Sequence, residues 1–386
     1  MSRPRRATTA VLAAVSLTAG MTATSLAVGD APAAAATTRT ATSVLADMSL
    51  AQRVGQLFMV GTPATSASSQ TLTAISRYHV GNVMLTGRSY AGTRATARVA
   101  AAVQARATTA ATHHVRLLVS TDQEGGAVQV LRGTGFSRMP SALDQGRRST
   151  SWLQSSATGW GRQLHTAGVN MNLAPVMDTV PSPTAARNNP PIGVYDREFG
   201  YTTSVVGSHG TAFALGMRAG HVAVAIKHFP GLGRVTANTD TSSGVTDRVT
   251  RRYDPYLAPF QRAIRADVPF VMMSTAYYSR LDANHPAAFS PFIMRTVLRG
   301  DLGFTNAIIS DDLGNARQVS RWSYGARATK FIGAGGDVVL TVNPSTLPAM
   351  YNAVLAKAKS DPAFRKKVNA AALHVLTIKQ RKGLLG

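Results

Sequence analysis

Uninterrupted hydrophobic runs recur along the chain at fairly regular intervals from residue 57 onward. Such runs are typical of strands that are covered on both faces, as in a parallel sheet flanked by helices. They predict eight strands, at Leu57–Pro63, Asn82–Arg88, Leu117–Gln123, Val169–Pro175, Val222–Phe229, Phe270–Ala276, Ala307–Asp312 and Asp337–Val342.

Segments with the polar and apolar spacing of helices separate these runs. They predict helices at Ala91–Thr112, Trp152–Ala167, Thr202–Ala219, Pro259–Ala266, Pro291–Arg299 and, as a closing helix rich in Lys and Arg, Pro362–Gly386. Eight strands that alternate with helices favour a single-domain α/β fold, a (β/α)8 barrel of the TIM type over residues 46–386. The same alternation leaves a doubly wound sheet as the alternative.

The N-terminal region differs from the rest in composition. Three arginines within the first six residues precede a mostly apolar run from about Ala10 to Val28, and an alanine-rich stretch ends at Ala36. This order is typical of a secretory signal peptide, which we predict for residues 1–36. A transmembrane anchor is the alternative, which the Ser, Thr and Gly interruptions disfavour. Thr- and Ala-rich residues 37–45 predict a short linker.

The charge of the chain limits the binding partners to be expected, and its cysteine content limits the covalent links it can form. The chain has 41 Lys and Arg against 18 Asp and Glu, and removal of residues 1–36 would lower the formal net charge from +23 to +21. For an exported chain this charge predicts attraction to an anionic cell-wall polymer. Specific nucleic-acid binding is not expected, because the basic residues are scattered without interleaved aromatics. The absence of cysteine excludes disulfides and a cysteine-linked lipid anchor. We therefore expect a secreted protein, with wall association as a further expectation and no membrane anchor.

Chemically active residues gather where the predicted strands end. Buried carboxylates are costly unless they are paired or used in chemistry, and barrel active sites lie at the C-terminal ends of the strands. The residues placed there are Asp122, Glu124, Asp178, Lys227, His228, Asp311 and Asp312.

Two glycine-containing turns carry part of this cluster. In Asp122–Gly126 the glycines allow a close backbone approach to a ligand, and Asp122 could accept hydrogen bonds from hydroxyl groups; a charged turn is the alternative. In Lys227–Gly233, adjacent strand residues alternate faces, so we expect only one of Lys227 and His228 to point directly into the barrel. The other would reach the site from the loop or contact the residues that support it. A core histidine is the alternative there.

Histidine spacing suggests no zinc site, and we expect no metal or cofactor.

These stretches resemble glycoside hydrolase family 3, and within it the single-domain β-N-acetylhexosaminidases. The matching stretches, in the family's order, are Ser49–Phe58, Asp122–Gly126, Ala174–Asp178, Arg197–Gly200, Lys227–Gly233, Gly303–Phe304 and Ser310–Leu313. The resemblance implies a retaining exo-glycosidase that removes terminal β-linked N-acetylglucosamine from peptidoglycan or chitin-type fragments.

The resemblance also implies roles for individual residues. Asp311 matches the nucleophile of the family, and Asp312 looks like a structural neighbour held by hydrogen bonds. The sugar-binding positions of the family match Asp122, Arg197, Lys227 and His228.

The chain departs from the family pattern at several positions. Val130 stands where the family usually has an arginine, which leaves the sugar preference open, and Leu232 replaces a histidine in Gly-Leu-Gly. The acid/base motif Asp-Ser/Thr-His aligns with 238–240, Asn-Thr-Asp, so that Asp240 takes the place of the histidine. If the loop is instead two residues longer, Asp240 takes the first place and Ser242 the third.

A carboxylic acid can protonate a glycosidic oxygen directly, so we expect Asp240 to be the acid/base, with Asn238 holding its orientation. Glu198, where the family often has serine, is the alternative acid/base. Two other functions stay open: a barrel that binds glycans or the cell wall without catalysis, and a β-glycosidase with a different sugar preference. A nucleic-acid binder is a more distant third.

Overall fold

The structure, a computed structural model, describes residues 12–14, 16 and 39–386. The chain divides into two units, Met1–Thr38 and Arg39–Gly386, and the barrel and its cavities lie in the second unit. The predicted signal peptide falls almost wholly outside the described residues. Part of the predicted linker is wrong: residues from Ala41 onward form helix α1 (Ala41–Asp47), which Thr40 begins through a capping box with Ser43.

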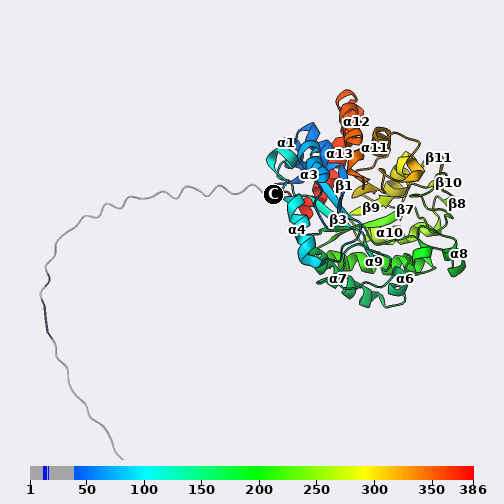
Figure 1. The fold of residues 1–386 in the computed structure, drawn as a ribbon, viewed down its shortest axis with the longest axis horizontal. Coiled ribbons are helices and arrows are strands. Elements are labelled where there is room, and N and C mark those ends of the chain that lie inside the picture. Colours follow the sequence, from blue (N-terminus) through cyan, green and yellow to red (C-terminus); the bar gives the residue numbers. More distant parts are fainter. Residues whose placement is uncertain (1–11, 15, 17–38) are drawn as a thin grey trace, which may run out of the picture. The chain divides into compact units, whose positions relative to one another are not determined.

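Eight parallel strands form the centre of the fold (Figure 1). Their order around the sheet is β12-β9-β7-β6-β3-β2-β1-β13. A bridge between Ile309 of β12 and Val338, just before β13, brings the two ends of this sheet together. The sheet is therefore a nearly closed barrel, which confirms the predicted (β/α)8 class and excludes the doubly wound sheet. The strands are β1 (Phe58–Pro63), β2 (Asn82–Thr86), β3 (Leu118–Thr121), β6 (Met171–Asn172), β7 (Ala223–Phe229), β9 (Phe270–Met273), β12 (Ala307–Ser310) and β13 (Val339–Thr341).

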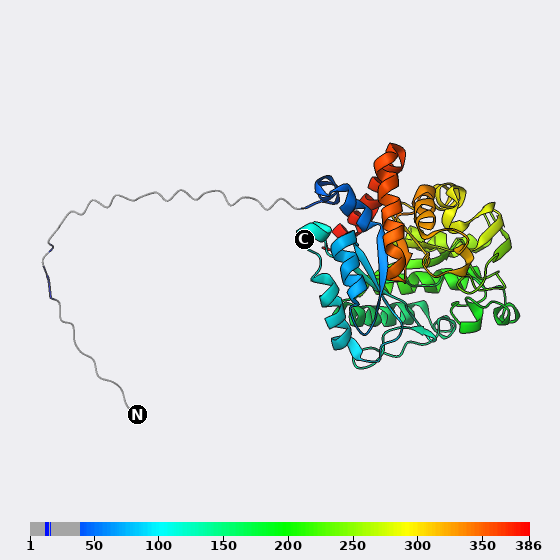
Figure 2. The same cartoon turned by 45° about the horizontal axis from the view of Figure 1, so that its top comes forward.

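Helices surround this barrel, as Figures 1 and 2 show. The predicted helix Ala91–Thr112 is two helices, because Thr108 caps a second start by accepting a hydrogen bond from the backbone N–H of Ala111. The closing helix ends at Arg381. The helices after α1 are α2 (Leu50–Gln56), α3 (Ser69–Tyr78), α4 (Gly92–Gln104), α5 (Thr109–Thr112), α6 (Ala142–Gln145), α7 (Thr150–Thr166), α8 (Pro183–Arg187), α9 (Thr203–Ala219), α10 (Ala258–Arg265), α11 (Tyr324–Ala334), α12 (Leu347–Ser360) and α13 (Pro362–Arg381). The π-helix η4 spans Phe292–Asp301, and short 3-10 helices occur at η1 (Gly193–Tyr195), η2 (Pro255–Leu257), η3 (Ala287–Phe289), η5 (Arg317–Val319) and η6 (Pro344–Thr346).

Alternation along each strand divides the core into two layers. In β1, Met59 belongs to the cluster that fills the barrel interior with Leu118 and Phe270. Its neighbours Phe58 and Val60 belong to the larger cluster between the strands and the helices. Both faces of β1 are thus apolar, as its continuous hydrophobic run in the sequence predicts.

Two small sheets lie outside the barrel. The hairpin of β4 (Gln123–Gly125) and β5 (Val128–Gln129) follows β3. A three-stranded sheet has the order β11-β10-β8 and consists of β8 (Thr246–Arg251), β10 (Tyr277–Arg280) and β11 (Asp282–Pro286). It lies on the right of Figure 1, across the barrel from α1 and the C-terminus. Both sheets are inserted after the C-terminal ends of barrel strands, where they can shape a site.

One lysine is buried at the opposite end of the barrel. Lys379 of α13 is fully buried and donates to Gln56 Oε1 at 2.8 Å and to the carbonyl oxygen of Gly81 at 2.7 Å. No acidic side chain among residues 39–386 pairs with it. Burial lowers the pKa of Lys379 from its usual value to about 7, because the charged form loses its hydration.

This lysine predicts a pH dependence of stability. Between pH 7 and about 10 the unfolded chain keeps the Lys379 proton while the folded chain releases it, so rising pH favours folding. Relative to Lys379→Met, the free energy of unfolding of the unmodified protein should rise by up to about 1.4 kcal/mol per pH unit over this window. Urea unfolding of both proteins at pH 6, 8 and 9.5 measures the difference. Parallel stability curves for the two proteins would show that this lysine does not change its protonation on folding.

Candidate active site

A cavity of about 300 Å³ opens at the C-terminal ends of the barrel strands. Its walls come from strand ends and from the loops after β3, β6, β7, β12 and β13. Its lining combines charged groups with a few apolar side chains, as ligand sites generally do. The lining residues are Met84, Asp122, Val128, Leu173, Pro191, Arg197, Lys227, His228, Leu232, Asn238, Thr239, Asp240, Met272, Asp311, Asp312, Asn315, Ala316, Leu340 and Val342.

One side of the cavity is a network of four charged residues. Lys227 Nζ lies 2.6 Å from Asp122 Oδ1 and 2.6 Å from Glu124 Oε1. Arg197 forms a two-pronged pair with Glu124, with Nε 2.9 Å from Oε2 and Nη2 2.8 Å from Oε1, and its Nη1 donates to the carbonyl oxygen of Pro191. Glu124, which does not line the cavity, therefore holds both cations in place, while Asp122, Arg197 and Lys227 line the cavity.

The charges of this network determine its protonation. Burial alone would raise the pKa of Glu124, but the neighbouring Arg197 and Lys227 outweigh it and bring that pKa down to about 2. Burial opposes the charged form of Lys227 as well, and the carboxylates of Asp122 and Glu124 more than offset it, so its pKa is raised. Both cations and Glu124 are thus charged at neutral pH, and the site offers fixed donors to a hydroxyl-rich ligand.

A second pair orients the histidine. His228 Nδ1 lies 2.7 Å from Asp178 Oδ2. Asp178 is fully buried, and its Oδ1 also accepts from the backbone N–H groups of His228 and Leu232 at 3.1 and 2.8 Å. Because Nδ1 donates its hydrogen to the carboxylate of Asp178, Nε2 is the ring nitrogen that can contact a ligand in the cavity.

Lys227 and His228 are adjacent in β7, and both line the cavity. The reason is an irregularity in the strand. The pairing of β7 with β9 shifts register between Ile226 and Phe229, so simple alternation does not hold across these two residues.

The two aspartates after β12 have different surroundings. Asp312 Oδ1 accepts from the backbone N–H groups of Gly314 and Val342 at 2.8 and 3.0 Å, and its Oδ2 accepts from Asn315 at 3.2 Å. Asp312 therefore ties the loop together, as predicted. Asp311 Oδ1 accepts from the Asp312 backbone N–H at 2.8 Å, and within residues 39–386 we find no partner for its Oδ2. Asp311 is the carboxylate that is held by one oxygen and available through the other.

Asp240 lies on the loop after β7, and its backbone is held on both sides. Its N–H donates to Asn238 Oδ1 at 2.8 Å, and its carbonyl oxygen accepts from the N–H of Arg317 at 3.0 Å. Asn238 thus positions Asp240 through the main chain and not through the carboxyl group. Asn238, Thr239 and Asp240 all line the cavity, whereas Ser242 does not.

The environment of Asp240 favours a protonated carboxyl group. Although the residue as a whole is exposed on its loop, its carboxyl group is surrounded by the other groups of the site. Loss of hydration, and then the negative charge of Asp311 and Asp312, raise its pKa to about 6 against the opposing charges of His228 and Arg197. A carboxyl group with this pKa can give a proton near neutral pH and take it back.

Glu198 lies outside the cavity. Both of its carboxylate oxygens are buried, and neither has a hydrogen-bond partner among the described residues. Burial, followed by the charges of Asp196 and Asp178, raises its pKa to about 7. The structure therefore does not bring Glu198 to the site, and its candidacy as the alternative acid/base receives no support.

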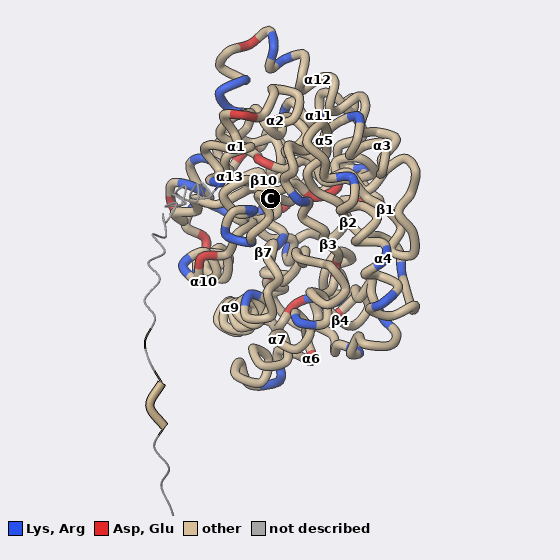
Figure 3. Tube along the Cα trace, turned by 90° about the vertical axis from the view of Figure 1, so that its left-hand side faces the viewer, with Lys and Arg blue, Asp and Glu red and all other residues tan. Residues whose placement is uncertain are grey.

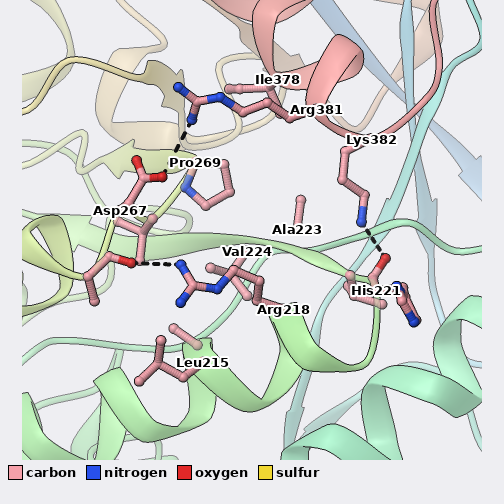
Figure 4. A pocket seen from close by; sticks show the side chains of 14 residues that line it. Leu215, Arg218, His221, Ala223, Val224, Asp267, Pro269, Ile378, Arg381 and Lys382 are labelled. Atoms are coloured by element: carbon pink, nitrogen blue, oxygen red, sulfur yellow. Dashed lines mark hydrogen bonds and ion pairs between the residues drawn. The ribbon is translucent and has the colours of Figure 1, made fainter.

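A cavity of about 260 Å³ lies at the other end of the barrel, between the start of β7, the segment before β9 and the end of α13 (Figure 4). Its basic groups are already engaged: Arg218 donates to the carbonyl oxygen of Ala266, Lys382 to that of His221, and Arg381 lies 3.6 Å from Asp267. It holds no pair of carboxylates, so glycosidic chemistry is not expected there.

The basic side chains are spread over the molecule. Figure 3 shows Lys and Arg on many separate elements, which agrees with the scattered basic residues of the sequence. Within the part of the chain that the structure describes, no group of three or more acidic or histidine side chains could hold a metal ion. None of the helices described has the length and apolarity to cross a membrane.

A nearly closed (β/α)8 barrel with several carboxylates in a cavity at its C-terminal end is an architecture that glycoside hydrolases use. The family model described as "Glycosyl hydrolase family 3 N terminal domain" matches residues 49–378. The chain belongs to this family and is a glycoside hydrolase.

Individual relatives agree with this assignment. The chain is 30% identical over 327 residues to a "Beta-hexosaminidase" of Stenotrophomonas maltophilia (strain R551-3), covering 82% of this chain and 92% of the relative. The crystal structure of a β-N-acetylhexosaminidase from Beutenbergia cavernae DSM 12333 is 55% identical, with a TM-score of 0.86 over 86% of this chain and 99% of the other. A family 3 β-N-acetylglucosaminidase from Paenibacillus sp. str. FPU-7 is 30% identical, with a TM-score of 0.80 over 87% of this chain and 63% of the other.

The buried network predicts that Glu124→Gln is costly. The substitution leaves Arg197 and Lys227 with one carboxylate fewer in a buried site, so the free energy of unfolding should fall by about 3 kcal/mol. The matched control is Asp144→Asn, which removes the exposed pair between Asp144 and Arg147 at 2.9 Å and should cost about 1 kcal/mol or less. Urea unfolding measures both. Equal losses for the two variants would contradict the role given to Glu124.

Proposed function

We propose that the protein is a retaining exo-glycosidase that hydrolyses terminal β-linked N-acetylglucosamine from peptidoglycan or chitin-type fragments. The observation that carries the proposal is the position of Asp311. Its carboxylate is anchored through one oxygen to the Asp312 N–H and lies in a cavity that also contains the donors Arg197 and Lys227. The volume, about 300 Å³, is at the small end for ligand pockets, which favours a single sugar at the end of a chain.

In the first step, the carboxylate of Asp311 attacks the anomeric carbon of the terminal sugar. The bond to the leaving-group oxygen breaks, and Asp240 gives that oxygen its proton, so that the leaving group departs as an alcohol. The products are a covalent glycosyl ester on Asp311 and an ionised Asp240.

In the second step, the carboxylate of Asp240 takes a proton from a water molecule as the water attacks the anomeric carbon. The ester bond to Asp311 breaks, the sugar is released with net retention of configuration, and Asp240 is protonated again. A pKa of about 6 serves both directions, because the same group must be acid in one step and base in the other.

The choice of sugar rests on the relatives, which are named β-hexosaminidase and β-N-acetylhexosaminidase. Asp122, Arg197, Lys227 and His228 are the groups we assign to sugar binding. Val130, which replaces the usual arginine, keeps a β-glycosidase of different sugar preference as an alternative to be assayed in parallel.

A second function is motivated by the missing histidine at position 240. A barrel that binds glycans or the cell wall without turnover would use the same cavity and the positive net charge. It predicts saccharide binding together with undetectable hydrolysis at every pH. The raised pKa of Asp240 favours the hydrolase, because a protonated carboxyl group can supply the proton that the histidine would otherwise provide.

We further propose that residues 1–36 direct export and that the basic mature chain associates with an anionic wall polymer. The support is the charged, apolar and small-residue order of the N-terminus and the formal charge of +23. Specific nucleic-acid binding is the distant alternative, which steeply salt-dependent DNA affinity would reveal.

Asp311→Asn should abolish turnover of an aryl β-N-acetylglucosaminide, because an amide cannot form the glycosyl ester. We expect kcat to fall by roughly 10³-fold or more, with folding unchanged by circular dichroism. Release of the aryl alcohol by the purified mature protein gives the rate, and aryl β-glucosides are run alongside. Turnover of the unmodified protein no higher than that of Asp311→Asn would contradict the proposed hydrolase.

Asp240→Ala should affect substrates according to their leaving groups. Cleavage of substrates with poor leaving groups should be crippled, whereas activated aryl glycosides, which need little protonation, should still form the glycosyl-enzyme. Added azide should partly restore turnover by attacking this intermediate in place of base-activated water. In the unmodified protein, kcat/KM for a poor leaving group should decline as pH rises through about 6, since the acid form of Asp240 is lost, and the variant should lack this decline. Unchanged activity on both substrate types would rule out Asp240.

A further inference from the structure

The cavity of about 260 Å³ at the N-terminal ends of the barrel strands is separate from the proposed active site. No residue lines both it and the cavity that contains Asp311. Its walls come from the end of α9, the start of β7, the segment before β9 and the end of α13. A ligand bound here would therefore leave the proposed active site free.

The inner part of this cavity is apolar. Val222, Ala223, Val224 and Val268 line it, and all four are buried members of the hydrophobic core. Leu215 of α9 adds a half-buried apolar side chain. A ligand that reaches this wall must present hydrocarbon to it, because a polar group there would lose its hydrogen bonds to water.

The outer part of the cavity is charged. Arg218, Asp267 and Arg381 line the cavity and are exposed, and Lys382 lines it and is half-buried. Figure 4 shows the side chains of Arg218, Arg381 and Lys382 approaching the cavity from different sides. With His221 counted as neutral, three cations stand against one anion, so the lining carries a net charge of two positive units.

The hydrogen bonds of two of these cations do not balance their charge. Arg218 Nη1 donates to the carbonyl oxygen of Ala266 at 3.0 Å, and Lys382 Nζ donates to that of His221, but a carbonyl group has no net charge. Neither cation forms an ion pair within residues 39–386. Each also keeps further N–H groups that could donate to a ligand.

The one acidic residue of the lining is used elsewhere. Asp267 lies 3.6 Å from Arg381 and also accepts from Asn306 Nδ2 at 2.9 Å. It can offset the charge of Arg381 but not that of the other two cations. Burial lowers the pKa of Lys382 from its usual value, because the charged form loses hydration that no carboxylate replaces. An anion in the cavity would supply the missing charge.

We propose that this cavity binds a small amphipathic anion, whose charged group is held by Arg218 and Lys382 and whose hydrocarbon chain lies against the apolar inner wall. Guanidinium and ammonium groups hold oxyanions through charge-assisted hydrogen bonds. The volume lies just below the range of about 300–1,000 Å³ for drug-sized ligands, which favours a chain of medium length over a long lipid chain. The inference goes beyond the proposed hydrolase and does not depend on it.

The probe for this site is hexanoate, which joins a carboxylate to a short hydrocarbon chain. Its comparison compounds are 1-hexanol and hexylammonium, which change the head group, and acetate, which lacks most of the chain. Calorimetric titration of the unmodified protein should give a Kd for hexanoate on the order of 1 mM or tighter. Acetate and 1-hexanol should each bind at least about tenfold more weakly, and hexylammonium should not bind. Undetectable binding of hexanoate, or equal affinity for hexanoate and 1-hexanol, would overturn the proposal.

The variants are Arg218→Gln with Lys382→Gln, and Arg265→Gln with Lys359→Gln as the matched control. All four side chains lie in or directly after the last turn of a helix, so both double variants lose two charges at helix C-termini. Arg265 and Lys359 are exposed, lie outside the cavity and form no ion pair among the described residues.

The first double variant should bind hexanoate at least about tenfold more weakly than the unmodified protein, whereas the control should bind it equally well. Equal losses in the two double variants would show attraction by net charge alone and would overturn the proposal. Unchanged affinity in the first double variant would do the same. Because the assay needs no turnover, its result is independent of whether the protein hydrolyses a glycoside.

Methyl-group NMR of the unmodified protein locates the bound hexanoate, and it decides the question if the first double variant fails to fold. Shifts of the methyl signals of Val222, Val224 and Val268 would support the proposed site. Shifts confined to Met272 and Leu340 would place the carboxylate in the cavity that contains Asp311 and overturn the proposal. Shifts in neither cavity would overturn it as well.

Discussion

The site depends on one buried carboxylate. Glu124 holds Arg197 with two hydrogen bonds and Lys227 with a contact of 2.6 Å, and these cations come from a loop before α9 and from the end of β7. Without this charge, two cations would be buried beside Asp122 alone, at a cost that their mutual repulsion increases. Glu124 thus makes a rigid donor surface out of segments that are distant in sequence. Donors held rigidly in place can stabilise the transition state of the reaction more than the bound sugar in its ground state.

Elsewhere in the lining of the cavity, the charged groups that lie near one another are negative. Loss of hydration, and then the negative charges of Asp311 and Asp312, raise the pKa of Asp240 to about 6. Asp312 accepts hydrogen bonds from three backbone N–H groups, whereas Asp311 is held through one oxygen only, which suits it to the nucleophile's role that we propose. A retaining mechanism needs one carboxyl group that is ionised and one that is protonated, so the two groups must lie in different environments. A carboxyl group in the place of a histidine is therefore compatible with the chemistry of the fold.

The sequence predicted the barrel well and the site in part. All eight barrel strands were found, because each is covered on both faces and its hydrophobic run is a local signal. The sheet of β8, β10 and β11 was missed, since its strands are polar and partly exposed and form no continuous hydrophobic run. The role of Glu124 was missed because it depends on partners 73 and 103 residues away, although its spacing of two from Asp122 placed it on the same face. Glu198 became a candidate only because it stands where the family often has serine, and this position does not reveal that its carboxylate is buried away from the cavity.

The proposed mechanism requires a covalent bond between Asp311 and the sugar. This bond can be detected by incubating the protein with a fluorinated N-acetylglucosaminide that forms the glycosyl ester faster than it hydrolyses, followed by mass spectrometry of the intact protein and its peptides. The mechanism predicts one added sugar per chain, located on the peptide that contains Asp311, with no label on Asp311→Asn. A label on another carboxylate, or turnover without any label, would contradict it.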